Sequence, residues 1–317
     1  MSDAVPVHVS IVIPVYNEEA NLEELLRRLV GAAQALGKPT ELIFVDDGSS
    51  DGTLAALKAF SSPVVDVRVV ELARNFGQHA AVMAGFTQCR GDIVVTIDAD
   101  LQNPPEEIPR LVAEMERGYD VVGSVRKDRQ DPFVRKISSR IVNRLVAKAT
   151  GHDLHDYGCM LRAYNHDTVR AMLDCPERRT FIPALAMTVA RTASEIEVGH
   201  ADRFEGKSKY NIFSLLRLNL DLMMGFTPIP LRLVSVTGML IAAVGLLFSL
   251  FLVIRRFVVG PEVEGVFTLF AGLYFFVGVQ IMAVGLIGEY MARTYDEVRG
   301  RPRFIIRHVH ARDGEAA

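Results

Sequence analysis

Two long stretches without a charged residue constrain this 317-residue chain more than any other feature of its sequence. They cover residues 234–254 and 265–288. At about 1.5 Å per residue, either stretch as a helix reaches ~30 Å or more, the thickness of a bilayer's hydrocarbon core. The alternative is a pair of buried core helices, but such helices are usually shorter and carry a polar stripe. We therefore predict two transmembrane helices over these residues, joined as a hairpin.

Arginines are distributed unevenly around the predicted hairpin. The connection between the stretches holds only Arg255 and Arg256, whereas the segment 291–317 is arginine-rich. The positive-inside rule then places both termini in the cytoplasm. A hairpin without charges inside the membrane is poorly suited to a channel or a pump, so we interpret it as an anchor.

Composition excludes several classes of protein. The net charge of −3 lacks the basic footprint of a nucleic-acid-binding protein, so we predict no nucleic-acid partner. The chain is 50% hydrophobic and 23% charged, which is typical of a folded protein with a real core. Its three cysteines have no CxxC spacing, which argues against a disulfide framework and a zinc site. The first residues lack a basic segment followed by an apolar run, so we expect no signal peptide.

The residues before the apolar stretches alternate between predicted strands and helices. Strands are expected at 8–15, 41–45, 67–72, 92–97, 121–125 and 194–198, and helices at 22–36, 51–60, 79–87, after Pro104–Pro105, and at 133–149. Asn21 is a candidate N-cap of the first helix, which Gly37 would end. Strands without polar alternation, joined by helices, indicate a mostly parallel α/β sheet with helices on both faces.

The predicted domains follow from this alternation. A catalytic α/β domain covers 1–210, and an amphipathic segment at the membrane surface covers 211–232. The hairpin covers 233–290 and a basic cytoplasmic tail covers 291–317.

Three predicted strands end in acidic and small residues. These ends are PVYNE at 14–18, DDGSSDG at 46–52 and DADLQ at 98–102. Ligands of an open parallel sheet bind at the carboxyl ends of its strands. Three acidic clusters at one edge would repel one another, but Mg²⁺ or Mn²⁺ with a phosphate-bearing ligand would neutralise them. The pattern predicts a metal–nucleotide site, and the alternative is a set of turn and helix-cap carboxylates.

The motifs PVYNEE, VDDGSSDGT and IDADLQNPPE resemble family 2 glycosyltransferases of the GT-A fold. More narrowly, the chain is similar to polyprenyl-phosphate glycosyltransferases, which include dolichol-phosphate mannose synthases and bacterial relatives with a C-terminal transmembrane hairpin. GSVR at 123–126, DYGCMLRAY at 156–164 and GKSKY at 206–210 extend the resemblance. FGQHAAVMAGF and the RPR near the end look like the branch that transfers 4-deoxy-4-formamido-L-arabinose in lipid A modification.

The resemblance implies a role for individual residues of this chain. Those expected to bind the nucleotide sugar are Pro14, Tyr16, Glu18, Asp47, Asp98 and Lys209. Those expected to hold the metal, Mg²⁺ or Mn²⁺, are Asp98, Asp100 and Gln102. Those expected to meet the acceptor or donor phosphates are Arg126, Arg140 and Arg203. Asp100 and Asp156 are the catalytic candidates, and Asp156 would act either as a base or by positioning the acceptor.

Some alternatives stay open at the level of single residues. Arg140 lies in a basic run that reads equally well as a solvated helix face. Arg203 and Lys207 could substitute for Lys209 in closing over the diphosphate.

The implied activity is an inverting transfer of 4-deoxy-4-formamido-L-arabinose from its UDP-sugar to undecaprenyl phosphate, at the cytoplasmic leaflet of the bacterial inner membrane. That reaction belongs to lipid A modification and resistance to cationic peptides. The partners are then the UDP-sugar, the lipid phosphate and the bilayer, and a homo-oligomer stays open. Alternatives are transfer of glucose or mannose to the same lipid, a metal-dependent phosphohydrolase with Asp98 as nucleophile, and a non-catalytic scaffold.

Overall fold

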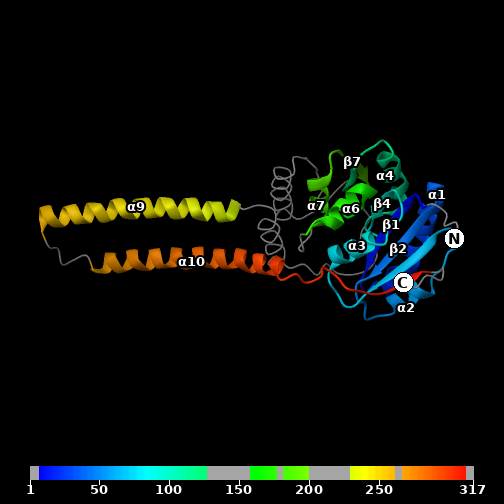
Figure 1. Cartoon of the computed structure of the whole chain (residues 1–317), viewed down its shortest axis with the longest axis horizontal. Helices are drawn as coiled ribbons and strands as arrows, with labels where there is room; N and C mark the ends of the chain where they lie inside the picture. The colour runs from blue at the N-terminus through cyan, green and yellow to red at the C-terminus, as the bar shows by residue number, and fades with distance from the viewer. Residues whose placement is uncertain (1–6, 127–157, 177–180, 200–228, 261–265, 312–317) are drawn as a thin grey trace. The chain divides into compact units, whose positions relative to one another are not determined.

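The computed structural model describes residues 7–126, 158–176, 181–199, 229–260 and 266–311 (Figure 1). The chain divides into two compact units. One comprises Met1–Asn219 with Pro302–Ala317, and the other comprises Leu220–Arg301.

The first unit contains an eight-stranded sheet of order β7-β5-β6-β4-β1-β2-β3-β8. Its strands are β1 (Val9–Val15), β2 (Thr40–Asp46), β3 (Asp66–Leu72), β4 (Ile93–Thr96), β5 (Val121–Arg126), β6 (Arg162–Asn165), β7 (Ala193–Val198) and β8 (Ile306–Ala311). Strand β1 pairs in parallel with both β2 and β4, β2 with β3, and β5 with β7. Strands β6 and β8 run antiparallel to their neighbours. The mixed sheet is therefore mostly parallel, as the sequence predicts.

Helices cover both faces of this sheet. They are α1 (Glu19–Leu36), α2 (Thr53–Ala59), α3 (Gln78–Phe86), the 3₁₀ turn η1 (Pro105–Glu107), α4 (Ile108–Met115), α6 (His166–Asp174) and α7 (Ile182–Val189). Every residue of β1 is buried, because its alternate side chains contact different layers. Ile11 and Ile13 join the core formed by α1 and α4, whereas Gly85 of α3 lies directly against Val12 on the other face.

The start of α1 differs from the prediction. The helix begins at Glu19, with Glu18 at the N-cap position, so the N-cap prediction for Asn21 is wrong. Asn21 lies in the first turn and donates through Nδ2 to Glu18 Oε2 at 2.7 Å. The predicted end is confirmed, because Gly37 takes the left-handed conformation, with φ of 62°.

Strand β8 is formed by residues that the sequence assigns to a basic tail. It pairs with β3, and Ala73 N donates to Ile305 O at 2.9 Å. Glu71 of β3, only 7% exposed, accepts from Lys58 at 2.8 Å and from His310 at 3.2 Å. The bond from Lys58 is the main cause that lowers the pKa of Glu71. The C-terminal segment is thus part of the same sheet as the N-terminal strands.

The second unit holds two long helices, α9 (Ile229–Val259) and α10 (Val266–Val298), which lie side by side (Figure 1). Gly245 of α9 faces Phe276 of α10, whose Cζ would lie 3.8 Å from a Cβ added at Gly245. Within α10, Phe275–Ala292 has a mean hydropathy of 1.6, is not buried, and is long and apolar enough to cross a membrane. Leu233–Gly245 of α9 is a shorter apolar stretch. Among the described residues, one helix thus meets the length and hydropathy expected of a span, where the sequence predicts two.

Candidate functional site

The strand order reverses at β1, which has β2 on one side and β4 on the other. In an open α/β sheet, ligands bind outside the carboxyl ends of the strands, at the point where the strand order reverses. The segments that leave β1, β2 and β4 there are the three acidic segments singled out in the sequence. The topology therefore brings 14–18, 46–52 and 98–102 to one edge of the sheet.

Hydrogen bonds join the segments after β1 and β2 into one rim. Asn17, with a positive φ of 54°, donates its backbone N–H to Ser49 Oγ at 3.0 Å. Its side-chain Oδ1 accepts from Ser50 N at 2.8 Å. Glu18 N donates to Thr53 Oγ1 at 3.0 Å. These bonds fix the backbone that follows Tyr16, so the first two acidic segments form a single surface.

The expected nucleotide-binding residues of β1 differ in exposure. Pro14 is buried within the strand, and Tyr16 is 47% exposed. Glu18 is half-buried and accepts the bond from Asn21 described above. Tyr16 is therefore the residue of this group that offers an open aromatic ring to a ligand.

Asp47 holds the loop that follows β3. Its carboxylate is 3% exposed and accepts Phe76 N at 2.7 Å and Gly77 N at 2.8 Å. Burial raises the pKa of Asp47, and these two backbone bonds oppose the rise. Each oxygen uses one of its two lone pairs in this way, so acceptor capacity remains for a ligand.

Gly48 allows the same loop to approach closely. Its φ is +74°, and a Cβ built there would lie 2.7 Å from the backbone of Arg74 and of Asn75. A glycine is therefore required by both the backbone conformation and the contact.

The third acidic segment presents three half-buried polar side chains, those of Asp98, Asp100 and Gln102. Asp98 accepts a hydrogen bond from Gln78 Nε2, at the first residue of α3. Asp100 Oδ1 accepts Gln102 N at 3.2 Å. Leu101 between them has a φ of 59°, which is uncommon for a bulky residue, and its side chain is 2% exposed. The buried leucine side chain thus turns the backbone so that its polar neighbours face outward.

This segment can hold a divalent cation jointly with a phosphate ligand. Among the described residues, no three His, Cys, Asp or Glu side chains gather as a closed metal site. Mg²⁺ in nucleotide enzymes is commonly held by only one or two carboxylates, with substrate phosphates and waters as the remaining ligands. Asp98 and Asp100, with the amide oxygen of Gln102, fit that requirement, although Asp98 also accepts from Gln78.

Among the residues predicted to bind the phosphates or the acceptor, the structure describes Arg126. Arg126 is half-buried at the carboxyl end of β5, the same edge of the sheet. Asp156, Arg140, Arg203 and Lys209 lie outside the described residues. The sequence motifs assign no role to Gln78, whose bond to Asp98 joins the start of α3 to the segment after β4.

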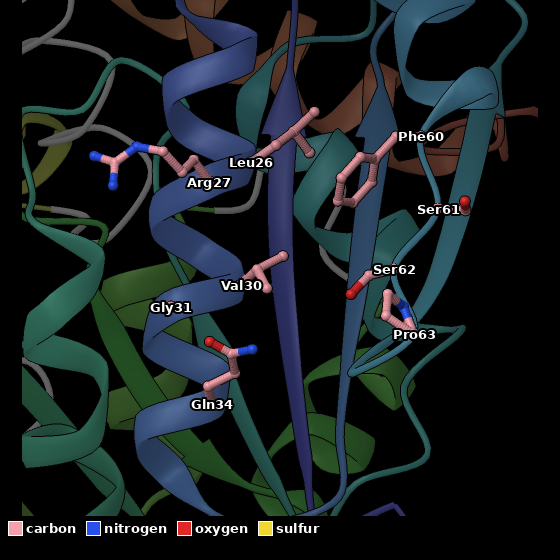
Figure 2. Close-up of a pocket in the computed structure, with 9 residues that line it drawn as sticks. All are labelled: Leu26, Arg27, Val30, Gly31, Gln34, Phe60, Ser61, Ser62 and Pro63. Carbon is pink, nitrogen blue, oxygen red and sulfur yellow. The ribbon is translucent and has the colours of Figure 1, made fainter.

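A separate surface pocket of about 520 Å³ lies between α1 and residues 60–63 (Figure 2). It is lined by Leu26, Arg27, Val30, Gly31, Gln34, Phe60, Ser61, Ser62 and Pro63. None of these is a predicted site residue. Residues 60–63 precede β3, so the pocket is not at the carboxyl ends of the strands.

Comparison with known proteins agrees with this arrangement. Residues 10–173 match Glycosyl transferase family 2. An Enterobacter sp. (strain 638) protein named undecaprenyl-phosphate 4-deoxy-4-formamido-L-arabinose transferase is 53% identical, covering 96% of this chain and 94% of the relative. An Edwardsiella ictaluri (strain 93-146) protein of the same name is 51% identical, covering 95% and 94%.

A solved structure shares the fold. Glucosyl-3-phosphoglycerate synthase from Mycobacterium tuberculosis, in complex with Mn²⁺, UDP and glucosyl-3-phosphoglycerate, has a TM-score of 0.51 and 18% sequence identity. The match covers 69% of this chain and 78% of the synthase chain. Because the family model covers residues 10–173 with all three strand-end motifs, and the relatives match nearly the whole chain, the chain belongs to glycosyl transferase family 2 and is a glycosyltransferase.

Proposed function

We propose that this glycosyltransferase moves 4-deoxy-4-formamido-L-arabinose from UDP to undecaprenyl phosphate, as the names of its relatives state for them. The observation that carries the proposal is identity of 51–53% over 95–96% of the chain, which includes the segments beyond the catalytic domain. The rim of acidic strand ends at the switch point of the sheet supports it, because a nucleotide-sugar diphosphate that binds together with a divalent cation suits such an edge.

The nucleoside part of the donor binds against the rim formed by the first two acidic segments. Tyr16 offers its exposed ring to the uracil or ribose, and Pro14 and Glu18 complete that wall. Asp47 serves twice, since it fixes residues 76–77 and keeps lone pairs for the base. This assignment follows the family pattern onto the matching positions of this chain.

Asp98, Asp100 and Gln102 hold the divalent cation, Mg²⁺ or Mn²⁺, together with the donor diphosphate. When bound, such a cation stabilises the negative charge that develops on the departing diphosphate. The chain's own contribution is to fix these oxygens in advance. Gln78 orients Asp98, and the strained turn at Leu101 keeps Asp100 and Gln102 outward.

The acceptor phosphate attacks the anomeric carbon from the face opposite the departing diphosphate, which inverts the configuration. The second pKa of a phosphate ester is about 6, so the acceptor is mostly dianionic at neutral pH and needs no general base. Asp156 therefore positions the acceptor, and Arg126, Arg140, Arg203 and Lys209 bind the acceptor and donor phosphates.

Helices α9 and α10 anchor the enzyme in the bacterial inner membrane as a hairpin with both termini cytoplasmic. The apolar window Phe275–Ala292 supports this, since an exposed 18-residue apolar surface is unfavourable in water. The anchor would keep the catalytic domain at the depth of the lipid's phosphate.

A panel of sugar nucleotides tests the proposal. The full chain in liposomes with undecaprenyl phosphate should form glycolipid with UDP-4-deoxy-4-formamido-L-arabinose and little with UDP-glucose or GDP-mannose. Product formed mainly from a hexose donor would favour the alternative of a polyprenyl-phosphate hexosyltransferase. UDP-sugar hydrolysis without any glycolipid would contradict lipid transfer altogether.

A further inference from the structure

A buried polar cluster lies beside the segment that carries Asp98 and Asp100. Its members are Asn103, Ser124 and Cys159, which are 4%, 0% and 1% exposed. Cys159 Sγ donates to Asn103 Oδ1 at 3.3 Å and lies 2.9 Å from Ser124 Oγ. Ser124 Oγ in turn donates to Leu161 O at 2.7 Å. The cluster thus connects three segments that are distant in sequence.

The thiol of Cys159 supplies a hydrogen-bond donor that the cluster otherwise lacks. The single hydroxyl proton of Ser124 is used on Leu161 O, so the serine can only accept from the thiol. The one S–H of Cys159 is then shared between two acceptors, Ser124 Oγ and Asn103 Oδ1. The side-chain oxygen of Asn103 is buried, and leaving such an acceptor without a donor is unfavourable.

The backbone around Cys159 is itself fixed. Thr96 Oγ1 donates to Met160 O at 2.6 Å, which fastens the start of β6 to the end of β4. The fully buried Arg162 donates through Nε to Cys159 O at 2.9 Å. The thiol therefore projects from a rigid support, and it can hold Asn103 rather than follow it.

Asn103 directly follows Gln102, and the turn that it ends is strained at Leu101. A left-handed conformation at a bulky residue persists only where its surroundings over-determine it. The buried side chain of Leu101 supplies one restraint, and the bond from Cys159 to Asn103 supplies another on the far side of Gln102.

We propose that Cys159 is a positioning residue of the transfer site: its thiol holds Asn103, and through it keeps the segment 98–102 in the geometry that binds the cation and the donor diphosphate. This rests on the proposed function. The residue also lies three positions after Asp156, so one side chain ties the donor-binding segment to the start of the segment expected to meet the acceptor.

Three variants separate this role from mere filling of the core. Cys159→Ala removes the donor and leaves a small cavity, Cys159→Val removes it and instead adds volume at the same site, and Cys159→Ser keeps a donor. Cys89→Ala is the matched control, because its thiol also makes a hydrogen bond, to Gly85 O at 3.4 Å, but at the C-terminal end of α3.

The readout is calorimetric binding of UDP in the presence of Mn²⁺ to the full chain, with hydrogen exchange of residues 98–104 measured without ligand. Residues behind metal ligands typically change affinity by about 10- to 100-fold when replaced, so Cys159→Ala and Cys159→Val should weaken UDP binding to that extent. Exchange at 98–104 should become faster in both. Cys159→Ser should restore both measurements to near wild-type values, and Cys89→Ala should change neither.

Wild-type UDP affinity and exchange in Cys159→Val, even with a lower melting temperature, would overturn the inference. Equal impairment of the serine and valine variants would also overturn it, because the hydrogen bond would then not matter. A wild-type chain that binds no UDP with Mn²⁺ would instead refute the proposed function, and this inference with it.

Discussion

Gly48→Ala should destabilise the catalytic domain more than an ordinary glycine replacement. At a φ of +74°, an alanine costs about 1–2 kcal/mol of backbone strain. Its Cβ would also lie 2.7 Å from the backbone of Arg74 and Asn75, and forcing such atoms apart costs a further ~1–3 kcal/mol. Gly37→Ala is the matched control, since its φ is +62° but no atom lies within 4 Å.

Thermal unfolding of the two variants in detergent measures the difference. The contact alone should lower the melting temperature of Gly48→Ala by roughly 2–12 °C relative to Gly37→Ala, taking about 2–4 °C per kcal/mol. UDP binding should weaken in Gly48→Ala as well, because residues 74–75 lead into the backbone N–H groups that Asp47 holds. Equal melting temperatures for the two variants would refute the close approach of the loops.

Three further outcomes are expected. Asp100→Asn should fold normally, because the side chains are nearly isosteric, yet lose most transfer activity; near-normal turnover that resists EDTA would rule out the metal role. Deleting residues 306–317 should lower the melting temperature, because it uncovers the edge of β3 and removes a partner of Glu71, whereas deleting 312–317 should not. Burial lowers the pKa of His79 to about 4. Near pH 6.5 the unfolded chain therefore binds a proton at this residue that the folded chain does not bind. Stability should then fall as the pH drops from 6.5 towards 4, and His79→Gln should flatten that profile in pH-dependent thermal unfolding.

The parallel core of the sheet could be predicted because the sequences of its strands are typical of buried parallel strands. Strands β1, β2 and β4 each contain a run of three or more apolar residues with β-branched side chains, which suits strands buried on both faces. Gly37 likewise gave the end of α1. The start of α1 was misjudged because Asn21 looks like a cap in isolation, whereas the backbone of Glu18 is fixed by Thr53 from another segment.

Strands β6 and β8 were not predicted from the sequence, for physical reasons. The four residues of β6 include Arg162 and Tyr164, both fully buried, and a short strand with such side chains lacks an apolar pattern. Strand β8 is an exposed edge with arginine and histidine side chains, so it reads as a solvated tail. Its partner β3 lies more than two hundred residues earlier in the chain. A catalytic fragment that ends before α9 would therefore lack one edge of its sheet.

The place of Asp98, Asp100 and Gln102 at the end of a strand could be predicted, because they follow a recognisable strand, and their metal role stays a prediction. The residues that support them could not be predicted. The contacts of Gln78 with Asp98 and of Cys159 with Asn103 depend on how distant segments pack, and no local pattern carries that information. The residues that position others can therefore be identified only from the three-dimensional structure.

The most direct measurement is a competition between two donors for one acceptor. The full chain in liposomes with undecaprenyl phosphate receives equal concentrations of UDP-4-deoxy-4-formamido-L-arabinose and UDP-glucose, and mass spectrometry of the lipid fraction counts both products. The account predicts that the formamido-arabinosyl lipid predominates and that neither product forms with Asp100→Asn. A predominance of the glucosyl lipid, or no glycolipid at all from an enzyme that binds UDP, would contradict it.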